Sequence, residues 1–90
     1  LVVEDDAVVA LDVAETLAES GFEVAGPAPS VARALDLIER AGCDVAVLDI
    51  NLGSETSAPV AQALIERGTP FVAMSGYSRE QLPAIFAERR

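Results

Sequence analysis

Four polar residues that could do chemistry together each follow an apolar run. They are Glu4, Asp5, Asp49 and Ser75. Carboxylates that crowd into one cleft repel one another and hold protons, unless a hard divalent cation such as Mg²⁺ shares their oxygens. With that cation bound, a free oxygen of Asp49 could attack a phosphoryl group. The residue types therefore predict a Mg²⁺ site for phosphoryl transfer, provided that the fold brings them together.

The apolar runs that precede these residues are predicted to be strands of a parallel sheet. Continuous apolar runs are typical of strands covered on both faces, and helices repeat apolar residues every three or four positions. The expected strands are 1–3, 22–25, 45–48 and 70–74; the expected helices are 7–20, 31–41 and a third from about Pro59 to Gly68. The polar residues 51–57 are expected to form the longest loop, and Pro83 to make the last helix short or irregular. This alternation predicts an α/β doubly wound sheet, in which ligands bind at the carboxyl ends of the strands.

Composition excludes several classes of function. The 90 residues carry a formal net charge of −9, which would repel a nucleic-acid backbone and argues against direct binding to DNA or RNA. All six basic residues are arginine, so no Lys or His is available for acid–base or nucleophilic chemistry. The single Cys43 excludes an intramolecular disulfide and is expected to be a packed side chain. No apolar run reaches the ~20 residues of a membrane helix, and we expect a cytoplasmic protein without membrane contact.

The order and spacing of the polar residues resemble the receiver domain of two-component response regulators. Residues 1–6 (LVVEDD) resemble the family's first strand and acidic pair, and 45–53 (VAVLDINLG) its third strand and phospho-accepting aspartate. Ser75 stands where the family has Ser or Thr, and the separations of 44 residues from Asp5 to Asp49 and 26 from Asp49 to Ser75 agree with the family. Residues 70–77 (PFVAMSGY) also resemble the FAT GUY receivers, an alphaproteobacterial subgroup that is typically single-domain and paired with HWE-type histidine kinases.

The resemblance implies a flavodoxin-like receiver fold with strand order 2-1-3-4, and it implies roles for the polar residues. Asp49 would accept a phosphoryl group from a kinase phosphohistidine. Asp5, Asp49 and the backbone carbonyl of Asn51 would bind Mg²⁺, and Glu4 would act on the ion through a water. The chain would then be a bacterial response regulator and not a metabolic enzyme, because its only chemistry would be its own phosphorylation and dephosphorylation.

A switch and a departure from the family also follow from the resemblance. Ser75 would bind a phosphoryl oxygen, Tyr77 would belong to the switch, and a downstream protein would read the change. A receiver has five strands and five helices, so we expect residues 1–90 to be a receiver domain incomplete at its C-terminus and trimmed at its N-terminus. The family's fifth strand carries a Lys, and this chain contains none. The open sheet edge would favour a homodimer.

Plainer interpretations stand beside these. The acidic run 4–6 could cap the first helix, which is the role expected of Asp6, and Asp49 and Ser75 could be ordinary turn residues. Tyr77 could be a packing residue. A phosphorylation-independent pseudo-receiver is one alternative function, because it would tolerate the absent Lys. A haloacid-dehalogenase-like phosphatase is another, although that family has a second Asp where Asn51 stands here.

Overall fold

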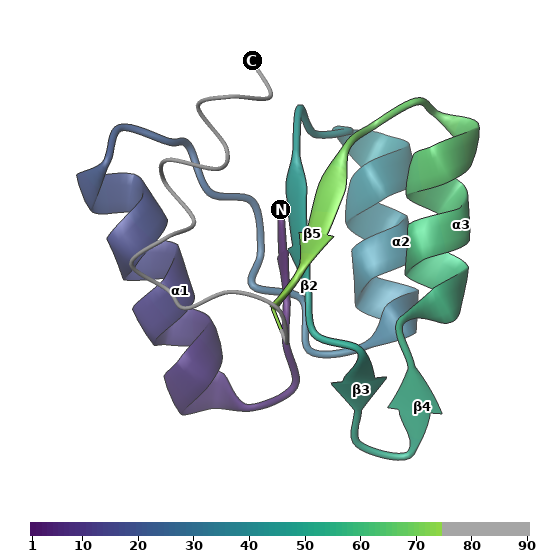
Figure 1. Cartoon of the computed structure of the whole chain (residues 1–90), viewed down its shortest axis with the longest axis horizontal. Helices are drawn as coiled ribbons and strands as arrows, with labels where there is room; N and C mark the ends of the chain where they lie inside the picture. The colour runs from purple at the N-terminus through teal and green to yellow at the C-terminus, as the bar shows by residue number, and fades with distance from the viewer. Residues whose placement is uncertain (75–90) are drawn as a thin grey trace.

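The computed structural model describes residues 1–74, which form a parallel sheet between two layers of helices (Figure 1). The three strands of the sheet lie in the order β1-β2-β5. They are β1 (Val2–Val3), β2 (Ala46–Leu48) and β5 (Phe71–Ala73). Helix α1 (Ala7–Glu19) covers one face, and α2 (Val31–Arg40) and α3 (Ala58–Glu66) cover the other. The expected doubly wound α/β sheet is confirmed, with most element ends within a residue of the prediction.

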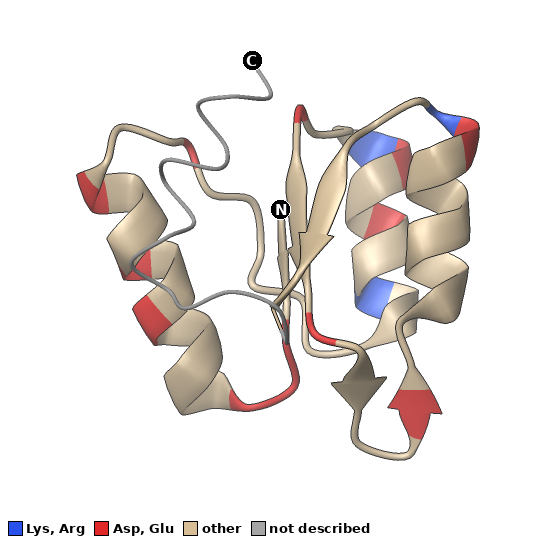
Figure 2. Cartoon of the chain, viewed as in Figure 1, with Lys and Arg blue, Asp and Glu red and all other residues tan. Residues whose placement is uncertain are grey.

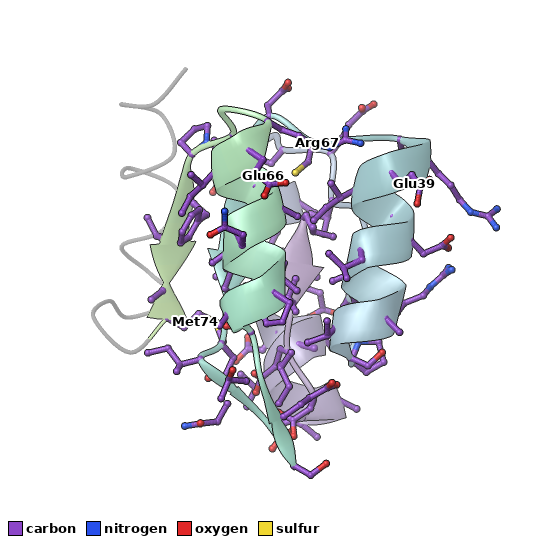
Figure 3. All side chains as sticks on the ribbon, turned by 90° about the vertical axis from the view of Figure 1, so that its right-hand side faces the viewer. Glu39, Glu66, Arg67 and Met74 are labelled. Atoms are coloured by element: carbon purple, nitrogen blue, oxygen red, sulfur yellow. The ribbon has the colours of Figure 1, made fainter. Side chains whose placement is uncertain are left out.

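Alternation along the strands divides the apolar core in two. Val2 lies beside Val47 and Val47 beside Val72, and all three face α1. Their neighbours along the strands face α2 and α3, which lie side by side in Figure 3. The buried residues of this second core include Val3, Leu48, Ile38, Val60 and Leu64. Because side chains on a strand alternate between faces, this register also decides which way the residues after each strand point.

The expected strand at 22–25 is wrong in its details, because the segment pairs with β1 irregularly. The Val2 N–H donates to the Ala25 carbonyl (3.1 Å), and the Ala28 N–H donates back to the Val2 carbonyl (2.8 Å). A regular parallel ladder would take that second donor from residue 27, but Pro27 has no N–H. The pairing therefore skips one residue and is left as a single bridge at Ala28. The segment still lies beside β1, on the side that the order 2-1-3-4 predicts.

The irregular pairing of this segment with β1 requires a glycine at position 26. Gly26 has a φ of +93°, and a Cβ there would lie 2.8 Å from the Ala28 nitrogen and 3.0 Å from the Val2 carbonyl oxygen. Backbone atoms on both sides could not move away without breaking the pairing with β1. Gly26 is therefore part of what keeps this segment against the sheet.

The expected loop at 51–57 instead contains a short antiparallel hairpin. Strands β3 (Asn51–Leu52) and β4 (Glu55–Thr56) pair, with Asn51 opposite Thr56. Leu52 is buried in the core beneath α2 and α3, while the rest of the hairpin is exposed. Gly53 adopts a φ of +70° at the turn, a conformation that glycine accepts without strain. This hairpin is the largest departure from the predicted secondary structure.

The side chain of Asp6 caps helix α1 as expected. The Asp6 carboxylate accepts hydrogen bonds from the Val8 and Val9 N–H groups (3.0 and 3.2 Å), which confirms its predicted role at the start of α1.

Three further expectations from the sequence can be compared with the fold. Cys43 is half-buried and packs against the α2–α3 core. The predicted helix around Pro83 lies outside the described residues. No helix within 1–74 has the length and apolar character needed to span a membrane.

Candidate functional site

Three carboxylates meet at the carboxyl ends of β1 and β2. Figure 2 shows acidic residues directly after both strands, at the lower edge of the sheet. Glu4, Asp5 and Asp49 each place one oxygen within 4.8 Å of the others. The strand register explains this meeting, because Val3 lies opposite Leu48 and the Asp49 N–H donates to the Val3 carbonyl (2.9 Å). The predicted convergence of these residues is therefore observed.

Burial and mutual repulsion set the electrostatics of this acidic cluster. Glu4 is only 5% exposed, and its covered Oε2 has no hydrogen-bond donor among the described residues. Burial, a side-chain hydrogen bond with Asp49 and the negative charges of Asp49 and Asp5 raise the pKa of Glu4 from 4.5 to about 8. Without a cation, the surroundings of Glu4 therefore disfavour its ionised form.

The donor set fits a hard divalent cation. Mg²⁺ prefers oxygen ligands. The three carboxylate oxygens of the acidic cluster lie within 4.8 Å of one another, close enough to share one metal ion. The buried Oε2 of Glu4 would gain a partner, either the ion or one of its waters. No described basic side chain forms an ion pair with these carboxylates. The cluster therefore has the composition of a cation site.

The β3–β4 hairpin lies against the acidic cluster. Asn51 begins β3 two residues beyond Asp49, and its side chain is exposed. At the turn, a Cβ on Gly53 would lie 3.6 Å from Oδ2 of Asp5. No role at the site was predicted for Gly53, although a glycine in a polar stretch just after a chemically active residue is a signal of close backbone approach. The hairpin thus carries the predicted carbonyl ligand Asn51 on a segment that contacts Asp5.

The predicted switch residues, Ser75 and Tyr77, lie outside the described residues, so their roles remain predictions. The strand that leads to them is correctly placed. Ala73 of β5 pairs with Leu48 of β2, so β5 ends at the same edge of the sheet as the acidic cluster. Met74, labelled in Figure 3, lies at that end of the strand.

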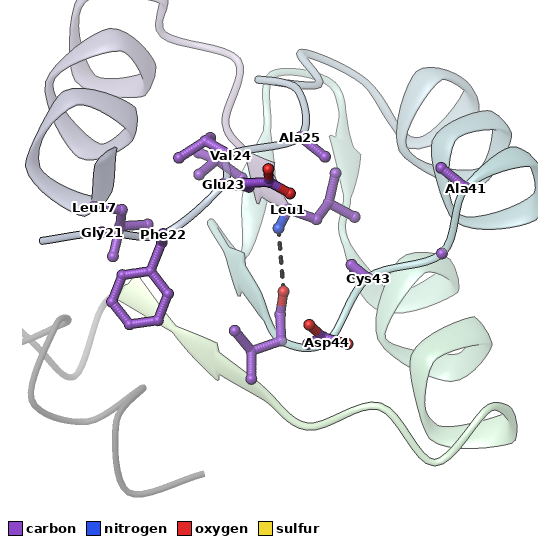
Figure 4. A pocket seen from close by; sticks show the side chains of 13 residues that line it. Leu1, Leu17, Gly21, Phe22, Glu23, Val24, Ala25, Ala41, Cys43 and Asp44 are labelled. Carbon is purple, nitrogen blue, oxygen red and sulfur yellow. Dashed lines mark hydrogen bonds between the residues drawn. The ribbon is translucent and has the colours of Figure 1, made fainter. Parts of the chain in front are cut away.

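Two cavities lie at opposite ends of the molecule. A small one of about 310 Å³ adjoins the acidic cluster and is lined by Glu4, Asp5, Ala7, Ala10, Pro27 and Pro29. A larger one of about 590 Å³ lies at the amino ends of β1 and β2 and is lined by residues that include Phe22, Glu23 and Asp44 (Figure 4). There the ammonium group of Leu1 donates to the Val45 carbonyl (3.1 Å). Within residues 1–74, only the acidic cluster groups three or more ligands close enough to hold a metal.

Comparisons with known proteins agree with this geometry. The transcriptional regulatory protein PdtaR from two strains of Mycobacterium tuberculosis is 29% identical to the chain over 83 residues. The aligned region is 91% of this chain, which spans about 40% of the length of those curated relatives. No solved structure gives a significant match. The family model of the response regulator receiver domain matches residues 1–88, a range that contains every predicted site residue, and the chain belongs to that family.

Proposed function

We propose that Asp49 accepts a phosphoryl group from a histidine kinase in a Mg²⁺-dependent reaction, and that this switches the chain's contacts with a downstream protein. Membership of the receiver family assigns the chain to two-component signalling. The observation that supports the finer proposal is the convergence of Glu4, Asp5 and Asp49 within 4.8 Å, around a buried oxygen without a donor. Such a site is unfavourable without a cation and well suited to one.

The side chains divide the chemistry between them. An oxygen of Asp49 attacks the phosphorus of the phosphohistidine, a P–O bond forms, and the P–N bond breaks with its electron pair returning to the histidine ring. Asp5 and Glu4 flank Asp49 at the carboxyl edge of the sheet and would supply the other carboxylate oxygens of the cation site. Mg²⁺, held by Asp5, Asp49 and the carbonyl of Asn51 with Glu4 acting through a water, would supply the positive charge that offsets the phosphoryl oxygens.

A bound cation would also change the protonation of Glu4. Mg²⁺ held by these carboxylates would favour the ionised form of Glu4 and would offset the repulsion among Glu4, Asp5 and Asp49.

Readout of the phosphoryl group is proposed to pass through Ser75 and Tyr77 to a protein partner. Ser75 would donate to a phosphoryl oxygen, and the backbone after β5 would follow it. The kinase is proposed to be of the HWE type, because residues 70–77 resemble the receivers that such kinases use. A cytoplasmic bacterial location, an output without metabolic catalysis and a homodimeric form complete the proposal.

A second candidate is a pseudo-receiver that binds its partner whether or not it is phosphorylated. Binding of the partner by an unphosphorylated variant would distinguish it from the first proposal. The phosphatase alternative has less support, because Asn51 stands where its second Asp is required.

Intact mass of the full chain, before and after incubation with a small phosphodonor, tests the proposal. We expect the mass of one added phosphoryl group with Mg²⁺ present and none after chelation. The Asp49→Ala variant should gain nothing. Labelling of that variant would overturn the site, and partner binding by Asp49→Ala as tight as by the parent would favour the pseudo-receiver.

A further inference from the structure

The β3–β4 hairpin is joined to α2 by a side chain far away in sequence. Oε2 of Glu55 accepts a hydrogen bond from the Val31 N–H at 3.1 Å, across 24 residues of chain. Figure 1 shows the hairpin beside the start of α2, below the sheet. A carboxylate at this position is favourable, because the first N–H groups of a helix are unpaired and carry partial positive charge. Glu55 therefore links two separate elements.

This bond is additional to the cap that α2 has from its own sequence. The Ser30 hydroxyl already accepts from the Arg33 N–H at 3.2 Å, which is the usual arrangement at a helix start. Helix α2 also packs on the sheet through Ala34 and Ile38, both buried. The helix is thus held without Glu55, and the element that depends on the bond is the hairpin.

The hairpin has few other attachments. Each strand has only two residues, and a two-stranded hairpin of this size is not stable by itself. Leu52 is buried in the core, and the Ser57 N–H donates to the Ile50 carbonyl (2.9 Å) at the base. Glu55 provides the attachment on the opposite strand from Leu52. Without it, β4 would be tied to the body of the domain only through its own chain ends and its pairing with β3.

At its other side the hairpin meets the acidic cluster. Gly53 lies near Asp5, since a Cβ on Gly53 would lie 3.6 Å from Oδ2 of Asp5, and Asn51 begins the same hairpin. Any change in how the hairpin sits would move both the Asn51 carbonyl and the backbone beside Asp5. The position of Glu55 and the geometry of the cation site are therefore connected through the six residues of the hairpin, 51–56.

We propose that Glu55 is a positioning residue for the cation site, acting through the hairpin that it fastens to the first turn of α2. The proposal rests on the proposed Mg²⁺-dependent function, since it concerns the ligand that the hairpin supplies. It does not require Glu55 to touch the ion. It requires only that the hydrogen-bond acceptor at position 55 be present.

The test compares Glu55→Ala with Glu55→Gln in the full chain. Both variants remove one negative charge, but only Gln keeps an oxygen that can accept from Val31. A hydrogen bond of this kind corresponds to about a three- to tenfold change in an equilibrium. We expect Glu55→Ala to weaken Mg²⁺ affinity by about that factor relative to Glu55→Gln, measured by titration calorimetry. Glu39→Ala, at an exposed position on α2 (Figure 3), is the matched control and should stay close to Glu55→Gln.

A second readout needs no metal. In the metal-free protein, the amide hydrogens of residues 51–56 should exchange several times faster in Glu55→Ala than in Glu55→Gln. Equal exchange rates in the two variants would overturn the role of Glu55. Faster exchange with no Mg²⁺ binding by the parent protein would instead uphold the fastening of the hairpin and refute the cation site. Faster exchange with equal Mg²⁺ affinities would show that the hairpin does not position a ligand.

Discussion

The two ends of the parallel sheet carry the same kinds of acidic residue in different surroundings. At the amino end, Glu23 and Asp44 are exposed at the rim of a large cavity. At the carboxyl end, Glu4 is buried against Asp49 and no described cation compensates either charge. Solvated or compensated carboxylates need no ligand. Crowded and uncompensated ones are what distinguishes a functional end of the sheet from a structural one.

The largest expected effect is on phosphate incorporation, compared between variants of the two aspartates near the ends of β2. Asp49→Asn should abolish phosphate incorporation, because the amide is not a nucleophile for phosphorus. Asp44→Asn, at the other end of the same strand, should incorporate phosphate at the rate of the parent protein. Transfer from a phosphorylated kinase, followed by electrophoresis that resolves phosphoprotein, measures both. Equal loss in the two variants would mean that the whole strand was disturbed and the comparison of ends was mistaken.

A smaller effect is expected on cation affinity. Glu4→Gln keeps the shape of the side chain and removes the charge that would hold a water of the ion. We expect Mg²⁺ affinity to fall by about tenfold or more, the usual consequence of losing an outer partner of a metal site. Glu23→Gln should leave the affinity unchanged. Titration calorimetry at constant ionic strength distinguishes the two, and a similar loss in both would point to net charge as the cause.

The pH dependence of stability should also differ between the ends. The pKa of Glu4 is about 8 in the folded state against an ordinary value of 4.5, so between these values the folded state binds more protons than the unfolded state. The contribution of Glu4 to the free energy of unfolding is therefore full below pH 4.5 and is lost as pH rises to about 8. Urea unfolding of the metal-free protein across this range should show the fall.

Two control variants test whether Glu4 causes this pH dependence. Glu4→Gln should remove most of the decrease in the free energy of unfolding with rising pH, whereas Glu23→Gln should not. Saturating Mg²⁺ should oppose it, because the ion binds the ionised carboxylates and binds more tightly as pH rises. A stability profile that is the same for Glu4→Gln and the parent would show that Glu4 is not the group that titrates.

The smallest effects concern two glycines in the same backbone conformation. Gly53 and Gly42 have φ values of +70° and +68°, so alanine at either position should lower the free energy of unfolding by about 1 kcal/mol. Only Gly53 lies against Asp5, while nothing lies within 4 Å of a Cβ at Gly42. We expect Gly53→Ala alone to change Mg²⁺ affinity, by about twofold. Urea unfolding and calorimetry on both variants give the comparison.

The sequence predicted the parts of the fold that local pattern determines. The apolar runs gave the strands of the central sheet, the acidic residues after them gave the acidic cluster, and Asp6 was correctly assigned as a cap. The β3–β4 hairpin was missed because its residues are polar and it depends on distant contacts, the burial of Leu52 and the bond from Val31 to Glu55. The roles of Ser75 and Tyr77 still depend on the family resemblance.

The prediction of a strand at 22–25 was wrong for a different reason. Its apolar residues suggest a strand, and it does lie beside β1, but Pro27 removes the donor that regular pairing needs. A single residue thus changed the form of the element and not its position. Periodicity shows where a chain is buried; it does not show whether each backbone group finds its partner.

The register of β1 against β2 has a consequence for how correctly folded molecules can be recognised. A shift of one residue would exchange the side chains of the two cores and would also turn Glu4 away from Asp49. A misfolded chain would then be chemically silent as well as unstable. Under the proposed function, phosphate uptake would therefore also serve as a folding assay that counts only molecules with the native strand alignment.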